Sequence, residues 1–180
     1  IAESQNDFAE ATFVADNFST INSGNSEISS PNAVTPGSYP FISLLCRFPD
    51  SGGSEESLSY FTGQYSNNYP GLSHYWSESS YGQFDLNGST ARNWKTLPHN
   101  KAYYHDGSSL NHDRLTADCT ALFDGEVNFS QYEGINMMFD ENFLQNYAWG
   151  GTQYRCLDGK CYWRMTWNPP WSWQNTSVLS

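Results

Sequence analysis

Residues 39–48, with the sequence YPFISLLCRF, give the strongest strand signal in the chain. The run is short, almost continuously apolar, and bounded by Pro40 and Pro49. Such a run is typical of a strand that is covered on both faces, since a half-exposed strand would alternate apolar and polar residues. The sequence therefore predicts a sheet in which this segment is a central strand.

Three helices are predicted after this strand. The first begins at Ser54, which caps it, and has Glu55 and Glu56 in its first turn, where carboxylates favour the helix dipole. The second runs from residue 72 to about 81, and the third from 109 to 125. The buried face of the first helix is predicted from its apolar spacing: Leu58, Phe61 and Tyr65.

Further strands are expected between and after these helices. Residues 84–86 and 94–97 are predicted to pair as a hairpin across an Asn87-Gly88 turn, and residues 98–109 to form a polar loop. Strands are also predicted at 135–139, 147–155 and 161–167. The alternation of strands and helices predicts an α/β or α+β fold in three layers.

The four cysteines are interpreted as two disulfides. Cys156 and Cys161 flank Leu-Asp-Gly-Lys, a tight-turn sequence, so they are expected to face each other across a hairpin. Cys46 and Cys119 are then paired by elimination, which would join the central strand to the third helix. The alternative is a zinc site, but an isolated C-x4-C spacing matches structural zinc poorly.

Composition indicates an extracellular protein. The net charge of −11 over 180 residues argues against a nucleic-acid partner and disfavours an anionic membrane surface. Abundant Ser and Asn and an even number of cysteines favour secretion. Neither a signal peptide nor a transmembrane run is evident. N-glycosylation sequons start at four positions: Asn17, Asn87, Asn128 and Asn175.

Residues 1–38 are rich in Ser, Asn and Pro and are predicted to be an extended arm or linker, ordered or not. Residues 39–180 are predicted to be a single domain that is incomplete at its C-terminus. The polar run Gln-Asn-Thr-Ser followed by Val178 and Leu179 is typical of the first turn of a helix.

Residue types that carry chemistry occur without a catalytic pattern. His105-Asp106 and His112-Asp113 could bind a metal, but we interpret them as solvated loop residues. No serine lies in a G-x-S-x-G elbow. The acids of the later strands are interpreted as surface residues rather than a glycosidase pair: Glu126, Glu133, Asp140 and Glu141.

The aromatic residues near the end of the chain allow two interpretations. They could stack on a carbohydrate, or they could pack the core, and packing is favoured. The residues concerned are Tyr162, Trp163, Trp167, Trp171 and Trp173.

Several segments together resemble secreted zinc metalloproteases of the immune inhibitor A type. The matching segments appear in the family's order: SYGQFDLNGS at 80–89, WKTLP at 94–98, VNFSQY at 127–132, YAWGGT at 147–152, TWNPPW at 166–171 and QNTSVL at 174–179. In the family, the last of these runs leads into the zinc-binding helix. The resemblance spans about residues 39–180.

The resemblance implies the N-terminal subdomain of a zincin, a twisted mixed sheet that carries helices. With the elements predicted above, the expected fold is an α/β (α+β) twisted mixed sheet with three helices and a disulfide-closed β-hairpin. In such enzymes a peptide substrate lies along an edge strand of the sheet. By position, that strand is expected to include six residues: Tyr147, Ala148, Trp149, Gly150, Gly151 and Thr152. The paired glycines would allow close backbone approach.

The sequence departs from the family at its metal sites. No His-Glu-x-x-His motif occurs, so no residue of the chain is expected to be catalytic or to bind metal, and zinc is expected only if the chain continues past Ser180. The segment 132–137, YEGINM, has too few carboxylates for the family's calcium-like loop.

Two functional hypotheses follow. The first is the N-terminal part of a secreted zinc endopeptidase-like domain, inactive alone, whose partner is a peptide or protein substrate. The second is a non-catalytic extracellular structural or adhesive module, glycosylated and self-associating through its arm at residues 1–38. A carbohydrate-binding module is a third and weaker hypothesis.

Overall fold

The predicted central strand is an interior strand of the sheet. The computed structural model describes residues 36–53 and 55–173, and the segment 39–48 contains strand β2 (Phe41–Arg47). All five residues between the two ends of β2 are buried. The prediction of a strand covered on both faces is therefore confirmed.

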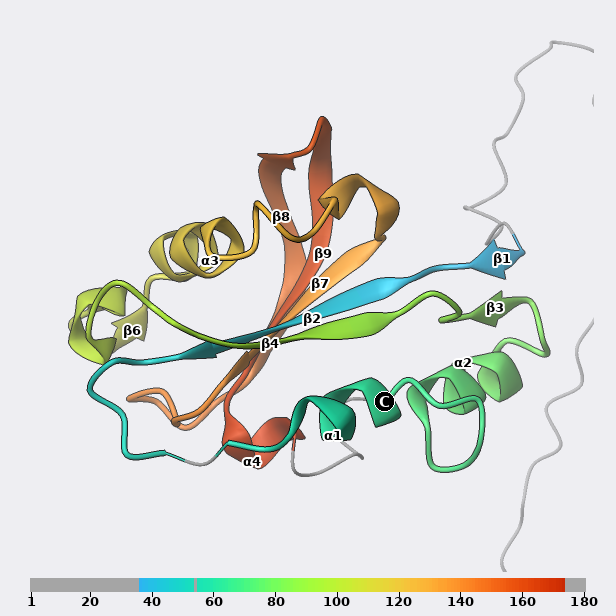
Figure 1. The fold of residues 1–180 in the computed structure, drawn as a ribbon, viewed down its shortest axis with the longest axis horizontal. Helices are drawn as coiled ribbons and strands as arrows, with labels where there is room; N and C mark the ends of the chain where they lie inside the picture. Colours follow the sequence, from blue (N-terminus) through green and yellow to red (C-terminus); the bar gives the residue numbers. More distant parts are fainter. Residues whose placement is uncertain (1–35, 54, 174–180) are drawn as a thin grey trace, which may run out of the picture. The chain divides into compact units, whose positions relative to one another are not determined.

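Five strands form one mixed sheet in the order β4-β2-β7-β9-β8 (Figure 1). Strands β4, β2, β7 and β9 run parallel to one another, and β8 is antiparallel to β9. The other four strands have these bounds: β4 (Thr90–Thr96), β7 (Gly134–Phe139), β8 (Trp149–Leu157) and β9 (Lys160–Asn168).

Helices cover both faces of the sheet (Figure 1). Helix α3 (His112–Ala121) covers one face, called here the α3 face. Helices α1 (Leu58–Gly63) and α4 (Pro170–Trp173) lie on the opposite face, called here the α1 face, with α2 (Leu72–Ser79) beside them. The mixed α/β class is confirmed, with four α-helices in the described residues instead of three.

The short elements complete the described chain. Two pairs of two-residue strands form small ladders: β1 (Gly37–Ser38) parallel to β3 (Phe84–Asp85), and β5 (His105–Asp106) antiparallel to β6 (Ser109–Leu110). Two 3₁₀ helices also occur: η1 (Lys101–Tyr104) and η2 (Phe129–Gln131). The predicted arm lies outside the described residues except at its end, where β1 pairs with β3.

The core is divided by the sheet. On the α3 face, the alternate residues Ile42, Leu44 and Cys46 of β2 join Leu115 and Phe123 in the larger cluster. On the α1 face, a smaller cluster contains Leu45, Phe61, Ala91, Met138 and Trp173. The alternation along each strand follows from the pleat, which sends successive side chains to opposite faces.

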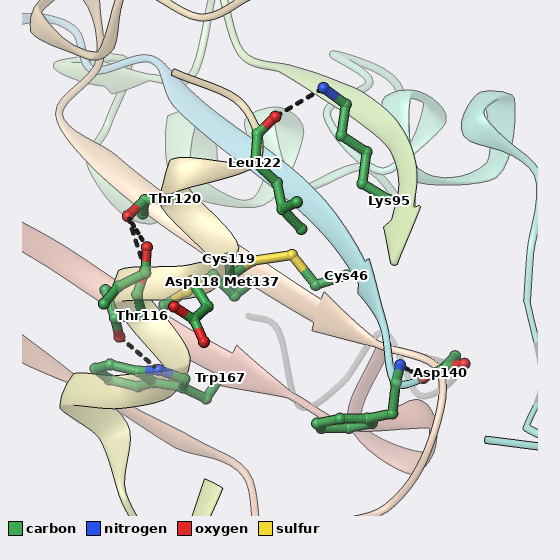
Figure 2. Close-up of a disulfide and its surroundings, with 12 residues drawn as sticks. Cys46, Lys95, Thr116, Asp118, Cys119, Thr120, Leu122, Met137, Asp140 and Trp167 are labelled. Carbon is green, nitrogen blue, oxygen red and sulfur yellow. Dashed lines mark hydrogen bonds between the residues drawn. A yellow bond between two sulfur atoms is a disulfide. The ribbon is translucent and has the colours of Figure 1, made fainter. Parts of the chain in front are cut away.

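Both predicted disulfides are confirmed. Cys46 of β2 and Cys119 of α3 are fully buried and bridge the sheet to its helix, with their Cα atoms 6.1 Å apart (Figure 2). Cys156 and Cys161 bridge the β8–β9 hairpin near its turn. That turn is made by Asp158 and Gly159, which both have positive φ, as Asp-Gly hairpin turns require.

The predicted start of the first helix is wrong. The helix begins at Leu58, and its cap is Ser57, whose Oγ accepts a hydrogen bond from the amide of Tyr60. Glu55 lies before the helix and pairs with Arg47 of β2 at 3.0 Å. The cap at Ser57 and the ion pair between Glu55 and Arg47 therefore decide where the helix begins, against the local preference for acids in the first turn. Leu58 is 36% exposed, so it is not part of the buried face.

The predicted hairpin at 84–97 is also wrong. The turn at Asn87-Gly88 exists, since Gly88 has a φ of +88° and the amide of Asn87 donates to Oδ1 of Asp85. However, the chain leaving the turn pairs in parallel with β2 instead of returning along β3. This pairing buries Ala91 in the α1-face cluster, which a two-stranded hairpin could not do.

The third helix is shorter than predicted. It is capped by Asn111, whose side chain accepts from the amide of Arg114, and it ends at Ala121. Residues 109–110 instead form β6, and the predicted polar loop at 98–109 contains η1 and β5. Of the five residues predicted for its apolar face, Leu115 and Cys119 lie in the helix and are buried. Leu110 and Phe123 are buried outside it, and Leu122 is partly buried.

Candidate functional site

The predicted substrate-binding segment maps largely to an edge of the sheet. Strand β8 has β9 on one side and, among the described residues, no strand on the other. Trp149, Gly150, Gly151 and Thr152 begin this strand and are exposed. Tyr147 and Ala148 precede it, and the hydroxyl of Tyr147 accepts from the amide of Leu110 on the α3 side. A substrate role for these residues stays a prediction.

A pocket of about 220 Å³ lies on the α1 face at the start of β8. Ala148, Trp149 and Gly150 line it from the edge strand, so it includes three of the six predicted residues. Its other walls include Tyr65, which follows α1, and Asn136 and Thr166 from the sheet. None of its ten lining residues is charged, which favours a neutral ligand group.

A row of polar side chains runs along the sheet beside this pocket. Ser43, Asn136 and Thr166 occupy matched positions on β2, β7 and β9, so they point to the same face. Tyr65 lies over the row: its hydroxyl is 2.7 Å from Ser43 Oγ and accepts from Asn136 Nδ2 at 2.8 Å. Polar residues in three buried strands are thus brought together by the sheet register.

The hydrogen bonds of this row continue to the end of β9. Thr166 donates to Asn136 Oδ1 at 2.8 Å, and Asn168 Nδ2 donates to Thr166 Oγ1 at 2.6 Å. The four residues from β2, β7 and β9, with Tyr65, are called here the polar ladder. If Tyr65 donates to Ser43, the hydrogen bonds of the polar ladder all run in one direction, from Asn168 at one end to Ser43 at the other. Hydrogen bonds aligned in this way strengthen one another.

The polar ladder contains no ionised group at neutral pH. Burial raises the pKa of Tyr65 to about 12, against the opposing effect of its hydrogen bonds to Ser43 and Asn136. The phenol therefore remains protonated, and amides and hydroxyls do not titrate. Such a surface can orient a ligand by hydrogen bonds, but it offers no general acid or base near neutral pH.

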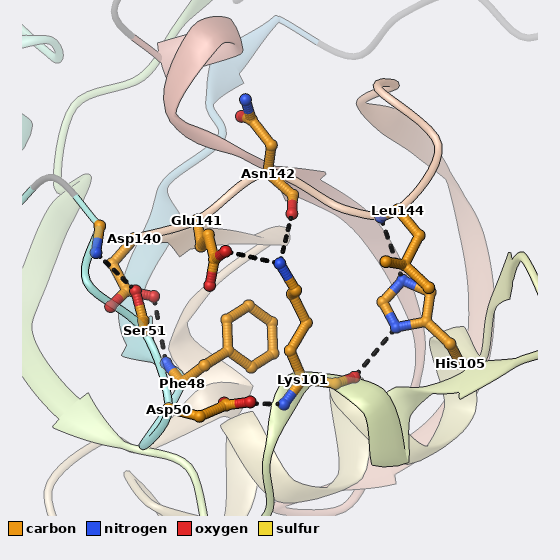
Figure 3. Close-up of polar contacts among 10 residues, drawn as sticks. Phe48, Asp50, Ser51, Lys101, His105, Asp140, Glu141, Asn142 and Leu144 are labelled. Atoms are coloured by element: carbon orange, nitrogen blue, oxygen red, sulfur yellow. Dashed lines mark hydrogen bonds and ion pairs between the residues drawn. The ribbon is translucent and has the colours of Figure 1, made fainter.

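The interpretation of His105 as a solvated loop residue is wrong. Its ring is buried, and its Nε2 accepts from the amide of Leu144, which leaves Nδ1 to donate to the carbonyl of Lys101 at 2.9 Å (Figure 3). His112 opens α3, lies against Trp149 and Trp167, and has a pKa lowered by burial. The role of His105 is structural, since both of its nitrogens are engaged.

One of the acids predicted to be at the surface is buried. Asp140, which follows β7, accepts from the amide of Phe48 at 3.1 Å, and burial raises the pKa of its carboxyl while hydrogen bonds from Phe48 and Ser51 oppose the rise. Nearby, Lys101 Nζ pairs with Glu141 at 2.6 Å (Figure 3). The first contact joins the loops after β2 and β7, and the second joins η1 to the loop after β7.

Three of the four tryptophans considered near the end of the chain pack the core, as favoured, whereas Trp171 is only partly buried. Trp163, Trp167 and Trp173 are at most 2% exposed, so they cannot form a stacking platform for a sugar. The indole of Trp167 donates to Thr116 of α3 at 3.0 Å (Figure 2). Tyr162 is exposed, on the opposite face of β9 from Trp163 and Trp167.

The described residues do not fit a metal site. They contain no group of three or more His, Cys, Asp and Glu side chains that could hold an ion. All four cysteines are in disulfides. We therefore assign no zinc-dependent step to any described residue.

Two of the predicted sequons lie within the described residues. Asn87 is exposed beside β4, and Asn128 is exposed at the start of η2, where its Oδ1 accepts from Ser130 of the same sequon at 2.6 Å. Asn17 and Asn175 lie outside the described residues. Glycosylation of all four stays a prediction.

The sequence contained a signal for the polar ladder that we missed. Asn136 interrupts the apolar run INMMF, and Ser43 interrupts FISLLCR. A lone polar residue in a strand buried on both faces needs a partner, so each was a candidate for a shared network. Which residues would meet depended on strand order and register, because Tyr65 and Thr166 are far away in sequence.

Comparison with known proteins does not assign the chain. No protein-family model matches it, and no curated protein sequence matches it at a significant level. Among the described residues, no helix has the length and apolarity needed to cross a membrane. The two disulfides are consistent with an oxidising compartment.

Proposed function

We propose that this chain supplies the peptide-binding sheet of a secreted endopeptidase-like domain of the immune inhibitor A type. An extended peptide or protein segment pairs with the outer edge of β8 and continues the sheet by one strand. Zinc ligands and the general base of such an enzyme are not assigned to any of these residues. The chain alone is therefore expected to bind peptides without cleaving them.

The observation that carries this proposal is the state of β8. The strand is nine residues long and exposed along most of its length, and no described strand pairs with its outer edge. Six of its residues, 149–154, are in regular register with β9. A long, regular strand edge of this kind is a template for another strand. Its sequence includes most of the YAWGGT segment on which the family resemblance partly rests.

The test uses backbone methylation of the ligand. A fluorescein-labelled peptide of about nine residues, rich in Thr and Val, is titrated with the 180-residue chain and followed by fluorescence anisotropy. Two methylated versions carry N-methyl groups at alternate residues, one on odd and one on even positions. A paired strand directs alternate amides to its neighbour, so one version should lose binding and the other should keep it.

The two methylated peptides also show how the proposal would fail. Equal binding by both versions would mean that the contact does not use the ligand's backbone, and the proposal would be abandoned. Absence of binding by the unmethylated peptide would have the same consequence. A longer form of the protein that contains His-Glu-x-x-His and binds stoichiometric zinc would support the endopeptidase assignment.

The same strand edge supports the alternative of a self-associating extracellular module. There, the added strand would come from a second copy, either from its β8 or from its arm at residues 1–38. Sedimentation velocity across a hundredfold range of concentration distinguishes the two. A monomer that binds peptide favours the peptide-binding function, whereas concentration-dependent oligomers that exclude peptide favour self-association.

A further inference from the structure

The β8–β9 hairpin differs in charge from the rest of the molecule. The chain has eight Lys and Arg against nineteen Asp and Glu. Residues 149–168 contain three of those cations, Arg155, Lys160 and Arg164, and only one acid, Asp158. The hairpin is therefore a cationic element of an acidic protein, and the strand that we propose to bind peptides is its outer half.

Arg164 is the cation best placed to meet a ligand. It lies on β9 directly opposite Thr152 of β8, and it is exposed. Five of the eight cations pair with carboxylates, but no carboxylate among the described residues lies within ion-pair distance of Arg164. Because Thr152 is small, the long arginine side chain can extend across β8 to its outer edge.

Arg164 faces the same side of the sheet as the pocket. Along β9, Trp163 and Met165 are buried in the α3-face core, so Arg164 and Thr166 project to the α1 face. Opposite residues of paired strands share a face, which places Gly150 beside Thr166 and Thr152 beside Arg164. The next pair, Tyr154 and Tyr162, is exposed, and their rings are in contact at 6.0 Å.

Gly150 opens the pocket toward the edge of the sheet. A Cβ atom at this position would lie 3.5 Å from Cγ2 of Thr166, in van der Waals contact. A larger side chain would therefore extend over Thr166 at the mouth of the pocket. With glycine present, a side chain from a strand paired with β8 can reach the amide and hydroxyl groups of Asn136 and Thr166.

We infer that this surface selects peptides with an uncharged polar side chain and an acidic side chain two residues apart. The inference rests on the proposed peptide-binding function of β8. Side chains of an added strand point to the α1 face at every second residue, about 7 Å apart. One of them enters the neutral pocket beside Gly150, and the next reaches Arg164 beside Thr152. The following one contacts the Tyr154–Tyr162 pair.

The test compares peptides that differ only at the acidic position. The probe is fluorescein-labelled Thr-Gln-Thr-Glu-Thr-Phe-Thr, with the reversed order Thr-Phe-Thr-Glu-Thr-Gln-Thr to cover both strand directions. Replacing the central Glu by Lys exchanges attraction for repulsion and should weaken binding about tenfold at low salt. The difference should shrink as salt is raised toward about 1 M.

Variants of the protein assign this preference to its source. Arg164→Gln should bring the Glu and Lys peptides within about twofold of each other, Arg164→Lys should keep most of the preference, and Arg164→Glu should reverse it. Arg92→Gln is the matched control, since it removes one charge from the opposite edge strand β4 and should leave the preference unchanged. Gly150→Val should lower the affinity for the Gln peptide to the level found for the same peptide with Ala in place of Gln.

The outcomes separate this inference from the proposed function. If the Glu and Lys peptides bind equally well, but binding still responds to alternate N-methylation, the inference is wrong and the proposed function stands. A charge preference that survives Arg164→Gln but is lost in Arg92→Gln would also overturn the inference. If no peptide binds, both are wrong.

Discussion

The two edges of the sheet are built differently. At one edge, β4 is covered by α1: the ring of Trp94 packs edge-on against Phe61 at 5.8 Å, and its indole donates to the carbonyl of Glu56 at 2.8 Å. The register between β4 and β2 shifts between Leu44 and Cys46. Lys95 of β4 extends to the carbonyl of Leu122, which follows α3 (Figure 2). These features block the pairing of a further strand.

At the other edge, β8 has little of this protection. Its register with β9 is regular over residues 149–154, and the irregularity occurs only beyond Tyr154, toward the disulfide. The hairpin projects beyond the helices (Figure 1). Proteins usually protect exposed strand edges against unwanted pairing. The contrast between the two edges therefore supports the proposed binding of a further strand at β8.

The largest predicted difference concerns the two disulfides. Cys46–Cys119 closes a separation of 73 residues and Cys156–Cys161 one of 5. On the chain-entropy model, replacing the first pair by alanines should lower the free energy of unfolding by about 4–5 kcal/mol, and replacing the second by about 2 kcal/mol. Urea denaturation of the two double variants measures both values.

The hairpin variant also tests whether β8 is a separate structural unit. Replacing both Cys156 and Cys161 by alanine should lower the peptide affinity of β8. Its effect on the packing around β4 should be small. Equal losses of stability from the two double variants would contradict the dependence on loop length from which the two values were derived.

The next effect concerns Tyr65, which joins the interior strands to the pocket at β8. Burial raises the pKa of Tyr65 to about 12 from 10, so the folded state holds this proton more tightly than the unfolded state does. The corresponding stability is fully present below pH 10 and is lost as the pH rises through 12. The expected loss is about 2–3 kcal/mol.

Urea denaturation at a series of pH values from 8 to 12 measures this loss. Tyr65→Phe should remove only the part of the alkaline loss that Tyr65 contributes, because burial and the hydrogen bond to Asp118 also raise the pKa of Tyr104. It should cost about 1 kcal/mol at neutral pH through the missing hydrogen bonds. The exposed Tyr162→Phe is the matched control and should keep the alkaline loss. An identical pH dependence in Tyr65→Phe and the unaltered chain would show that Tyr65 is not the group responsible.

The smallest effect compares one tryptophan from each edge. Trp94→Ala removes the packing on α1 and should cost about 2 kcal/mol of stability, since the side chain is half-buried. Trp149 is 54% exposed, so Trp149→Ala should cost less than about 0.5 kcal/mol but should weaken peptide binding, because Trp149 stands on the strand with which the peptide would pair. Thermal unfolding and anisotropy titration of both variants measure the two effects. If Trp149→Ala destabilised the fold more than Trp94→Ala, the contrast between the edges would be wrong.

Local signals predicted some elements well and others poorly. Strand β7 and the β8–β9 hairpin were predicted closely, because an apolar run and an Asp-Gly turn between cysteines act over a few residues. The pairing of β4 was not, since an Asn-Gly turn is as compatible with a loop as with a hairpin. Of the candidate site, residues 149–152 were predicted by resemblance, whereas the polar ladder and Arg164 were not.

The sequence by itself determined the mixed α/β class, the two disulfide pairings and the burial of the strand at Phe41–Arg47. These depend on composition, spacing and short-range pattern. Only the tertiary structure decided that Ser43, Asn136 and Thr166 form one row, that Tyr65 covers it, and that Arg164 lies beside an open edge. Strand order and register bring these residues together, and both depend on long-range pairing that minimises buried unsatisfied polar groups and exposed apolar area across the whole sheet.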